Sequence, residues 1–97
     1  MGNKVFIIQL MSGRSDEEVL DERKAVERQL REWGYEPIES YVEEDAPEGV
    51  CIPVWYLARS IEKLSEADYI YLIDGWEKGR GCKIERDIAE AYGIPEV

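Results

Sequence analysis

Residues 67–85 read ADYIYLIDGWEKGRGCKIE, which is an apolar strand, a glycine-rich turn and a helix with a glutamate in its first turn. In an open α/β sheet, ligands bind at the loops that leave the carboxyl ends of the strands. The start of the following helix offers free N–H groups and the positive end of its dipole to anions. This stretch therefore indicates an α/β fold and marks the region where a binding site is expected.

The remainder of the chain alternates apolar runs with amphipathic segments. Three strands, a short fourth strand and three helices are predicted. The strands span 4–10, 35–42, 68–74 and 94–97, and the helices span 16–33, 53–66 and 81–92. Pro37 assigns the second strand to an edge, because proline cannot donate to a ladder. With right-handed crossovers, this order predicts one domain over residues 1–97, a three-layer α/β fold whose parallel sheet has the order 2-1-3-(4).

The spacing of apolar residues predicts which face of each helix is buried. The expected buried positions are Val19, Val26, Leu30 and Trp33 in the first helix, Val54, Leu57, Ile61 and Leu64 in the second, and Ile84, Ile88 and Ala91 in the third. Glu85 then lies with Ala89 and Tyr92 on a stripe roughly 100° away, beside the core. Ser15 is expected to cap the first helix, and Gly34 and Gly93 are expected to end the first and third helices.

Composition and charge exclude several classes of function. The net charge of −10 argues against a DNA or RNA partner, which needs a concentrated basic face. No apolar run reaches the length of a membrane span, and no apolar signal segment is evident, so a cytoplasmic protein is expected. The two cysteines, Cys51 and Cys82, are expected to be free thiols. Without histidine, neither a cysteine–histidine dyad nor a standard zinc site is available, and no metal or cofactor is predicted.

Two turns are expected at the carboxyl ends of neighbouring strands and would form the lips of a ligand crevice. One lip consists of Ser12, Gly13 and Arg14, and the other contains Gly75, Trp76, Gly79, Arg80 and Gly81. Either arginine offers a site for a phosphate or carboxylate. The alternative interpretation gives these residues structural roles only: the glycines form a turn, and Trp76 is a packing lid rather than a ring on which a base or sugar stacks. The stripe of Tyr56, Ser60 and Lys63 is expected to be surface.

Two carboxylates flank the second turn. Glu85 either complements the helix dipole or takes part in chemistry. Asp74 either initiates the turn before Gly75 or acts as an acid. Cys82 is expected to be a structural thiol.

Taken together, residues 67–85, Met11-Ser12-Gly13 and the segment 89–95 resemble the small nucleoside 2-deoxyribosyltransferase-like proteins of bacteria and phages. The resemblance covers nearly the whole chain, except the loop around 43–52. It implies a flavodoxin-like sheet and a carboxylate nucleophile at Glu85 that attacks C1′ of a deoxyribose, with Asp74 or Glu77 as the acid. The related 2′-deoxynucleoside 5′-phosphate N-hydrolases share this chemistry, which parallels that of retaining glycosidases.

The chain departs from this family at two positions. Phe6 stands where relatives carry a tyrosine that orients the nucleophile, and Ser60 stands where they carry an aspartate. Three hypotheses follow: an N-glycosidic enzyme, a nucleoside- or nucleotide-binding protein without turnover, and an assembly domain. A homo-oligomer is expected, because an open sheet edge and exposed aromatic residues in so small a domain favour association.

Overall fold

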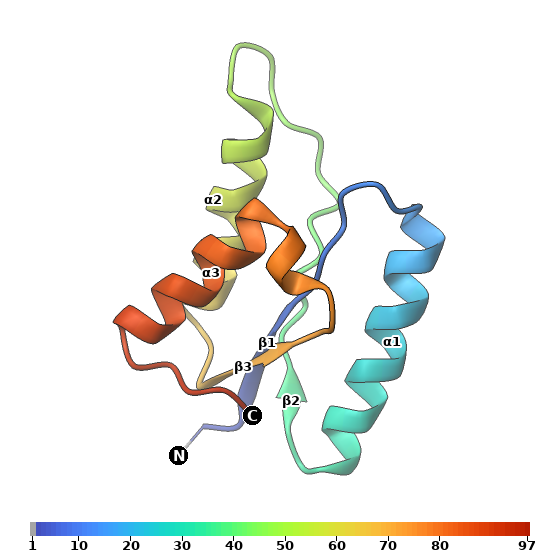
Figure 1. Cartoon of the computed structure of the whole chain (residues 1–97), viewed down its shortest axis with the longest axis vertical. Helices are drawn as coiled ribbons and strands as arrows, with labels where there is room; N and C mark the ends of the chain where they lie inside the picture. Colours follow the sequence, from blue (N-terminus) through green and yellow to red (C-terminus); the bar gives the residue numbers. More distant parts are fainter. Residues whose placement is uncertain (1) are drawn as a thin grey trace.

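Three parallel strands lie at the centre of the molecule, with helices on both sides (Figure 1). The computed structural model describes residues 2–97. Along the chain the elements are β1 (Lys4–Ile8), α1 (Asp16–Glu32), β2 (Glu36–Pro37), α2 (Ile52–Leu64), β3 (Tyr69–Leu72), the 3₁₀ turn η1 (Trp76–Lys78) and α3 (Arg80–Ala91). The strand order β2-β1-β3 confirms the predicted sheet and the edge position of β2.

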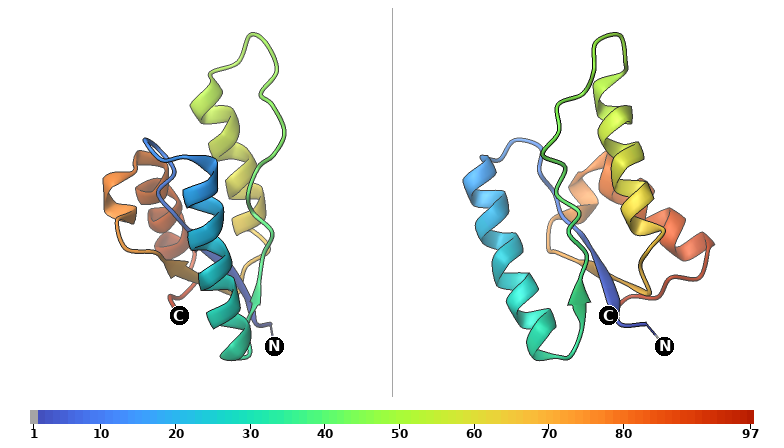
Figure 2. Two further views of the ribbon diagram at one scale, coloured as in Figure 1. Left: turned by 90° about the vertical axis from the view of Figure 1, so that its right-hand side faces the viewer. Right: turned by 180° about the vertical axis from the view of Figure 1, so that it is seen from behind.

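Alternation along β1 divides the core into two layers of side chains. Val5 and Ile7 pack with Leu30 of α1 on one face of the sheet. Phe6 and Ile8 pack with Leu64 of α2 on the other face, where residues of α3 complete the cluster. Seen from behind, α1 lies on one side of the strands and α2 and α3 on the other (Figure 2). The three-layer prediction is therefore correct.

The outer strands are shorter than expected. The predicted strand over 35–42 is reduced to Glu36–Pro37, although the Ile38 amide still donates to the Val5 carbonyl at 2.9 Å. Beyond it the chain leaves β1, and Ser40 is engaged by a side chain of α1. The expected fourth strand is a single parallel bridge between Ile70 and Glu96.

The ends of α1 follow the predicted chemistry. The Ser15 hydroxyl caps the helix by accepting a hydrogen bond from the Glu18 amide at 3.1 Å. Trp33 is the last half-helical residue, and Gly34 follows with a φ of +91°, a left-handed conformation that glycine adopts at little cost. Trp33 is 55% exposed, so its predicted burial is wrong: the helix ends there and the side chain lies beyond the sheet.

Helix α2 projects past the body of the molecule at its amino-terminal end (Figure 1). Leu64 at the other end is buried, and Leu57 and Ile61 are half-buried. Val54 is 60% exposed, which contradicts its predicted burial, because the first turn of the helix has no sheet beneath it. Within residues 2–97, no helix is both long and apolar enough to cross a membrane.

The buried face of α3 differs from the prediction. Its buried residues are Cys82, Glu85 and Ala89, whereas Ile84 is 43% exposed and Ala91 is also exposed. Ile88 is half-buried against the core, and Tyr92 is exposed at the end of the helix. Cys82 packs into the core cluster at the first turn and so sets the rotation of the helix. Glu85, one turn later, is turned inward rather than lying beside the core.

Candidate functional site

Glu85 is a buried carboxyl group on the inner face of α3. Its side chain is only 8% exposed. Burial disfavours the charged form and raises the pKa of Glu85 from 4.5 to about 7. Two groups act in the opposite direction: hydrogen bonding by the Ser60 hydroxyl of α2, and the positive charge of Arg23 on α1. The carboxyl group is therefore poised between its protonated and ionised forms near neutral pH.

Arg23 lies on α1, on the other face of the sheet from α3, and its charge acts on the Glu85 carboxyl group. It lies on the buried stripe of α1 and is 3% exposed. Its Nε donates to Gln9 Oε1 at 3.2 Å, and its Nη1 donates to Ser40 Oγ at 2.8 Å. Burial lowers the pKa of Arg23, and nearby acids including Glu85 oppose that change. The Arg23 charge is thus buried, bound by neutral partners, and lowers the pKa of Glu85.

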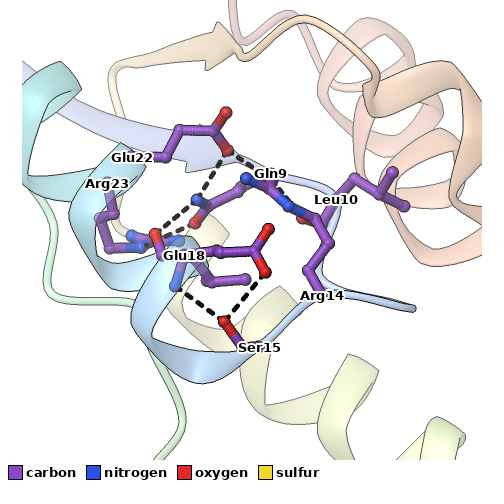
Figure 3. A network of polar contacts seen from close by, with 8 residues as sticks. Gln9, Leu10, Arg14, Ser15, Glu18, Glu22 and Arg23 are labelled. Atoms are coloured by element: carbon purple, nitrogen blue, oxygen red, sulfur yellow. Dashed lines mark hydrogen bonds and ion pairs between the residues drawn. The ribbon is translucent and has the colours of Figure 1, made fainter.

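A second set of contacts fixes Gln9 and, through it, the Arg23 side chain (Figure 3). Gln9 Nε2 donates to the Val19 carbonyl at 2.8 Å and to Glu22 Oε1 at 3.0 Å. The same Glu22 oxygen accepts from Arg14 Nη1 at 2.6 Å. The hydrogen bond from Arg14 lowers the pKa of Glu22. The network joins the end of β1 to α1 and orients the side-chain oxygen of Gln9, Oε1, toward Arg23.

A pocket of about 570 Å³ takes both Ser40 and Ser60 into its lining. Its wall is formed by the turn after β1, the start of α1, the segment after β2 and the middle of α2. The lining residues are Met11, Asp16, Leu20, Ser40, Tyr41, Val42, Glu43, Glu44, Asp45, Tyr56 and Ser60. Ser40 accepts from Arg23, and the Ser60 hydroxyl lowers the pKa of Glu85. Ser40 therefore connects the pocket to the buried Arg23 guanidinium, and Ser60 is the lining residue that acts on the Glu85 carboxyl group.

A second hollow, of about 510 Å³, lies entirely on α1. Its lining residues are Lys24, Glu27, Arg28, Arg31 and Glu32. All are charged side chains of one helix, none of them among the buried residues of α1, which is typical of a solvated helix surface.

The glycine-rich turn has packing roles. Gly75 has a φ of +97° and starts the 3₁₀ turn. A Cβ on Gly79 would lie 3.1 Å from both Leu10 Cδ1 and Cys82 Sγ, so this glycine permits close contact between the two turns. Trp76 packs against the core, and the Arg86 guanidinium lies 5.9 Å from its ring centroid. The lid interpretation of Trp76 fits these contacts.

The comparison with protein families matches nearly the whole chain. The family described as a domain of unknown function (DUF4406) matches residues 3–97. The chain belongs to this family. No curated protein and no solved structure matches the chain.

Only part of the predicted site is brought together in this DUF4406 domain. Leu10, just before the first turn, lies close to Gly79 of the second turn. The pocket, however, takes Met11 from the first turn and no residue of 75–81. Ser12 and Gly13 are exposed, and Arg14 is paired with Glu22. Asp74 and Arg80 are exposed and lie outside the pocket lining, as do Gly81 and Trp76.

Sequence reasoning missed several residues of the pocket region. Tyr56 and Ser60, expected at the surface, line the pocket. Arg23 and Gln9 carried a signal: each is polar and interrupts an otherwise apolar stripe or strand. No such signal marked Ser40 and Tyr41, because both fall within the predicted strand 35–42. Within the described range 2–97, no group of three or more His, Cys, Asp or Glu side chains is arranged to hold a metal ion.

Proposed function

We propose that this protein cleaves the N-glycosidic bond of a 2′-deoxynucleoside or deoxynucleotide, as a transferase or hydrolase, with Glu85 as the nucleophile. One observation carries the proposal: Glu85 is a buried carboxyl group outside the pocket lining, and the Ser60 hydroxyl, which lowers its pKa, is part of that lining. Buried carboxyl groups with a raised pKa are concentrated at functional sites. The resemblance of residues 67–85 to nucleoside 2-deoxyribosyltransferase-like proteins supports the same residue.

In the proposed reaction, a Glu85 carboxylate oxygen attacks C1′ of the deoxyribose. The C1′–N bond breaks, its electron pair leaves with the base, and the base takes up a proton from water. A glycosyl ester on Glu85 results. Water or a second base then attacks C1′, the ester C1′–O bond breaks, and its electron pair returns to Glu85 as carboxylate. This is the double displacement of retaining glycosidases, with nitrogen in the leaving group.

The neighbouring groups suit a carboxylate in this role. Ser60 and Arg23 both lower the pKa of Glu85 and so favour the ionised, nucleophilic form against the cost of burial. Because the pKa remains about 7, turnover should increase with pH through neutrality as the carboxylate forms. Asp74 lies outside the pocket lining and is given no step in this mechanism.

A second candidate function is binding without turnover in the same pocket. Phe6 favours it, because this side chain is 2% exposed within the core cluster and offers no hydroxyl to orient Glu85. Enzymes gain rate from groups held in place by supporting contacts, and one such contact is absent here. The two functions share a ligand class and differ in whether product appears.

The test is incubation with each common 2′-deoxynucleoside and its 5′-monophosphate, with and without an added base, followed by chromatography of released bases and new nucleosides. Glu85→Gln should abolish release while ligand affinity stays within about tenfold, since the amide keeps the shape and loses the nucleophile. Glu90→Gln, at an exposed position of the same helix, is the matched control and should retain full activity.

Acid-quenched samples analysed by mass spectrometry should carry one deoxyribosyl group on the peptide that contains Glu85. Binding without product would favour the second candidate function. Neither binding nor product with any of these compounds would contradict both, and would leave the assembly hypothesis.

A further inference from the structure

The charged residues of the pocket lining are all acidic. Asp16 stands at the start of α1, and Glu43, Glu44 and Asp45 follow one another in the segment between β2 and α2. None of the residues that line this pocket, within the described part of the chain, is basic. At pH 7 a ligand in this pocket therefore faces a negative field, which the net charge of −10 reinforces.

The arginines that lie near the pocket are already bound within the chain. Arg14 donates to Glu22 at 2.6 Å and to the Leu10 carbonyl at 3.1 Å. Arg23 is 3% exposed and donates to Gln9 and Ser40. Recognition of a phosphate by arginine requires a guanidinium fork that faces the ligand, and these two forks face their own partners.

The start of α1 is equally unsuited to a phosphate. A helix N-terminus attracts anions through its free N–H groups and its dipole. Here the Ser15 hydroxyl accepts from the Glu18 amide, and the first turn carries Asp16, Glu17 and Glu18. These three carboxylates already complement the positive end of the dipole.

The rest of the lining suits a neutral, partly aromatic ligand. Tyr41 and Tyr56 offer rings, and Met11, Leu20 and Val42 add apolar surface. The Tyr41 hydroxyl donates to Asp16 Oδ1 at 3.1 Å, which joins two residues of the pocket lining. Ser40 and Ser60 provide hydroxyls of the kind that pair with a sugar. Behind them, Glu85 is more than nine-tenths buried and adds another acidic group.

We propose that the pocket selects an uncharged nucleoside over its 5′-phosphate, and that the acidic rim of Glu43, Glu44 and Asp45 sets this preference. The inference rests on the proposed function, which leaves the phosphate state of the ligand open. Like charges that meet in a pocket repel, and repulsion against the wrong ligand is a common source of specificity. A nucleoside 5′-monophosphate carries close to two negative charges at pH 7.

The test compares binding of each 2′-deoxynucleoside and its 5′-monophosphate to the Glu85→Gln variant by titration calorimetry, so that turnover does not interfere. The wild-type ratio of kcat/KM for the two ligand forms is the second measurement. We expect the nucleoside to bind at least about tenfold more tightly at low salt. The preference should shrink in 1 M NaCl, where charges are screened beyond about 3 Å.

Neutralising the rim with Glu43→Gln, Glu44→Gln and Asp45→Asn together should reduce the preference to less than about threefold, mainly through tighter binding of the phosphate form. The matched control removes the same number of charges at Glu36, Glu66 and Glu96, which are exposed and lie outside the pocket lining. That control should leave the preference unchanged.

The outcomes separate the two proposals. Equal or tighter binding of the 5′-phosphate would overturn this inference and leave the proposed function standing. An unchanged preference in the rim variant would overturn the role of Glu43, Glu44 and Asp45. If neither ligand form binds and the wild type shows no turnover, the proposed function fails, and the inference fails with it.

Discussion

Replacing Glu85 by glutamine should make the protein more stable at high pH. The pKa of Glu85 is about 7 in the folded protein, against 4.5 for an exposed glutamate. Below pH 4.5 the group is protonated in both states and carries no penalty. Between about pH 4.5 and 7 the unfolded chain ionises this group while the buried carboxyl group stays protonated, so stability is lost over that window and the loss levels off above pH 7, where both states are ionised. Each pKa unit corresponds to 1.36 kcal/mol, so the full loss is about 3 kcal/mol.

The assay is urea unfolding of the wild type and Glu85→Gln at several pH values. The difference in unfolding free energy between them should grow in favour of the variant by about 2.5 kcal/mol between pH 5 and pH 9. All other titrating groups are common to both proteins, so they largely cancel in this difference. Glu66→Gln, at an exposed position, is the control and should run parallel to the wild type. A constant offset between wild type and Glu85→Gln over this range would refute the argument.

Three further predictions concern other parts of the molecule. Arg23→Met removes a charge that lowers the pKa of Glu85, so ¹³C NMR titration of the Glu85 carboxyl carbon should give a midpoint above 7; an unmoved midpoint would contradict the coupling. Cys51 is exposed, whereas Cys82 is buried and its pKa is raised to about 11. A thiol reagent at pH 8 should therefore modify Cys51 quickly and Cys82 only after unfolding, and Cys51→Ser should remove the fast phase. An exposed apolar surface at the projecting end of α2 and the loop before it consists of Val50, Ile52 and Val54. Light scattering should therefore give a mass above the 11.2 kDa of one chain, and the double variant Ile52→Glu, Val54→Glu should return the protein to a monomer. A wild-type monomer at tens of micromolar would oppose the expected homo-oligomer.

Much of the fold follows from signals that are local and strong. The apolar run at β1 is buried on both faces, and nothing in its sequence competes with a central strand. Ser15 and Gly34 mark the ends of α1 by backbone chemistry that needs no tertiary contact. Pro37 predicted the edge strand but not its length. That length is set where Ser40 meets Arg23, a contact between residues far apart in the sequence.

The sequence singled out Glu85, but it did not identify the walls of the neighbouring pocket. Residues 67–85 singled out Glu85 from sequence pattern, yet helical spacing favoured Ile84 for the buried face because isoleucine is apolar. In the structure Cys82 packs into the core, Glu85 and Ala89 face inward with it, and Ile84 is exposed. The pocket wall depends on Tyr41 and Tyr56, and their position follows from how the loop and α2 pack rather than from periodicity.

The burial of Glu85 is itself an argument about function. A carboxyl group with a pKa of about 7 costs stability at neutral and higher pH, whereas alanine or glutamine at this position would not carry that cost. Groups that reduce stability are retained where they serve activity, and they tend to lie beside a cavity with supporting polar contacts. The Ser60 hydroxyl lowers the pKa of Glu85, and Ser60 also lines the pocket. A dipole-complementing glutamate would instead be exposed at the surface of the helix, where ionisation costs nothing. A gain in stability of Glu85→Gln in the urea assay would therefore be evidence against a purely dipole-complementing role for Glu85.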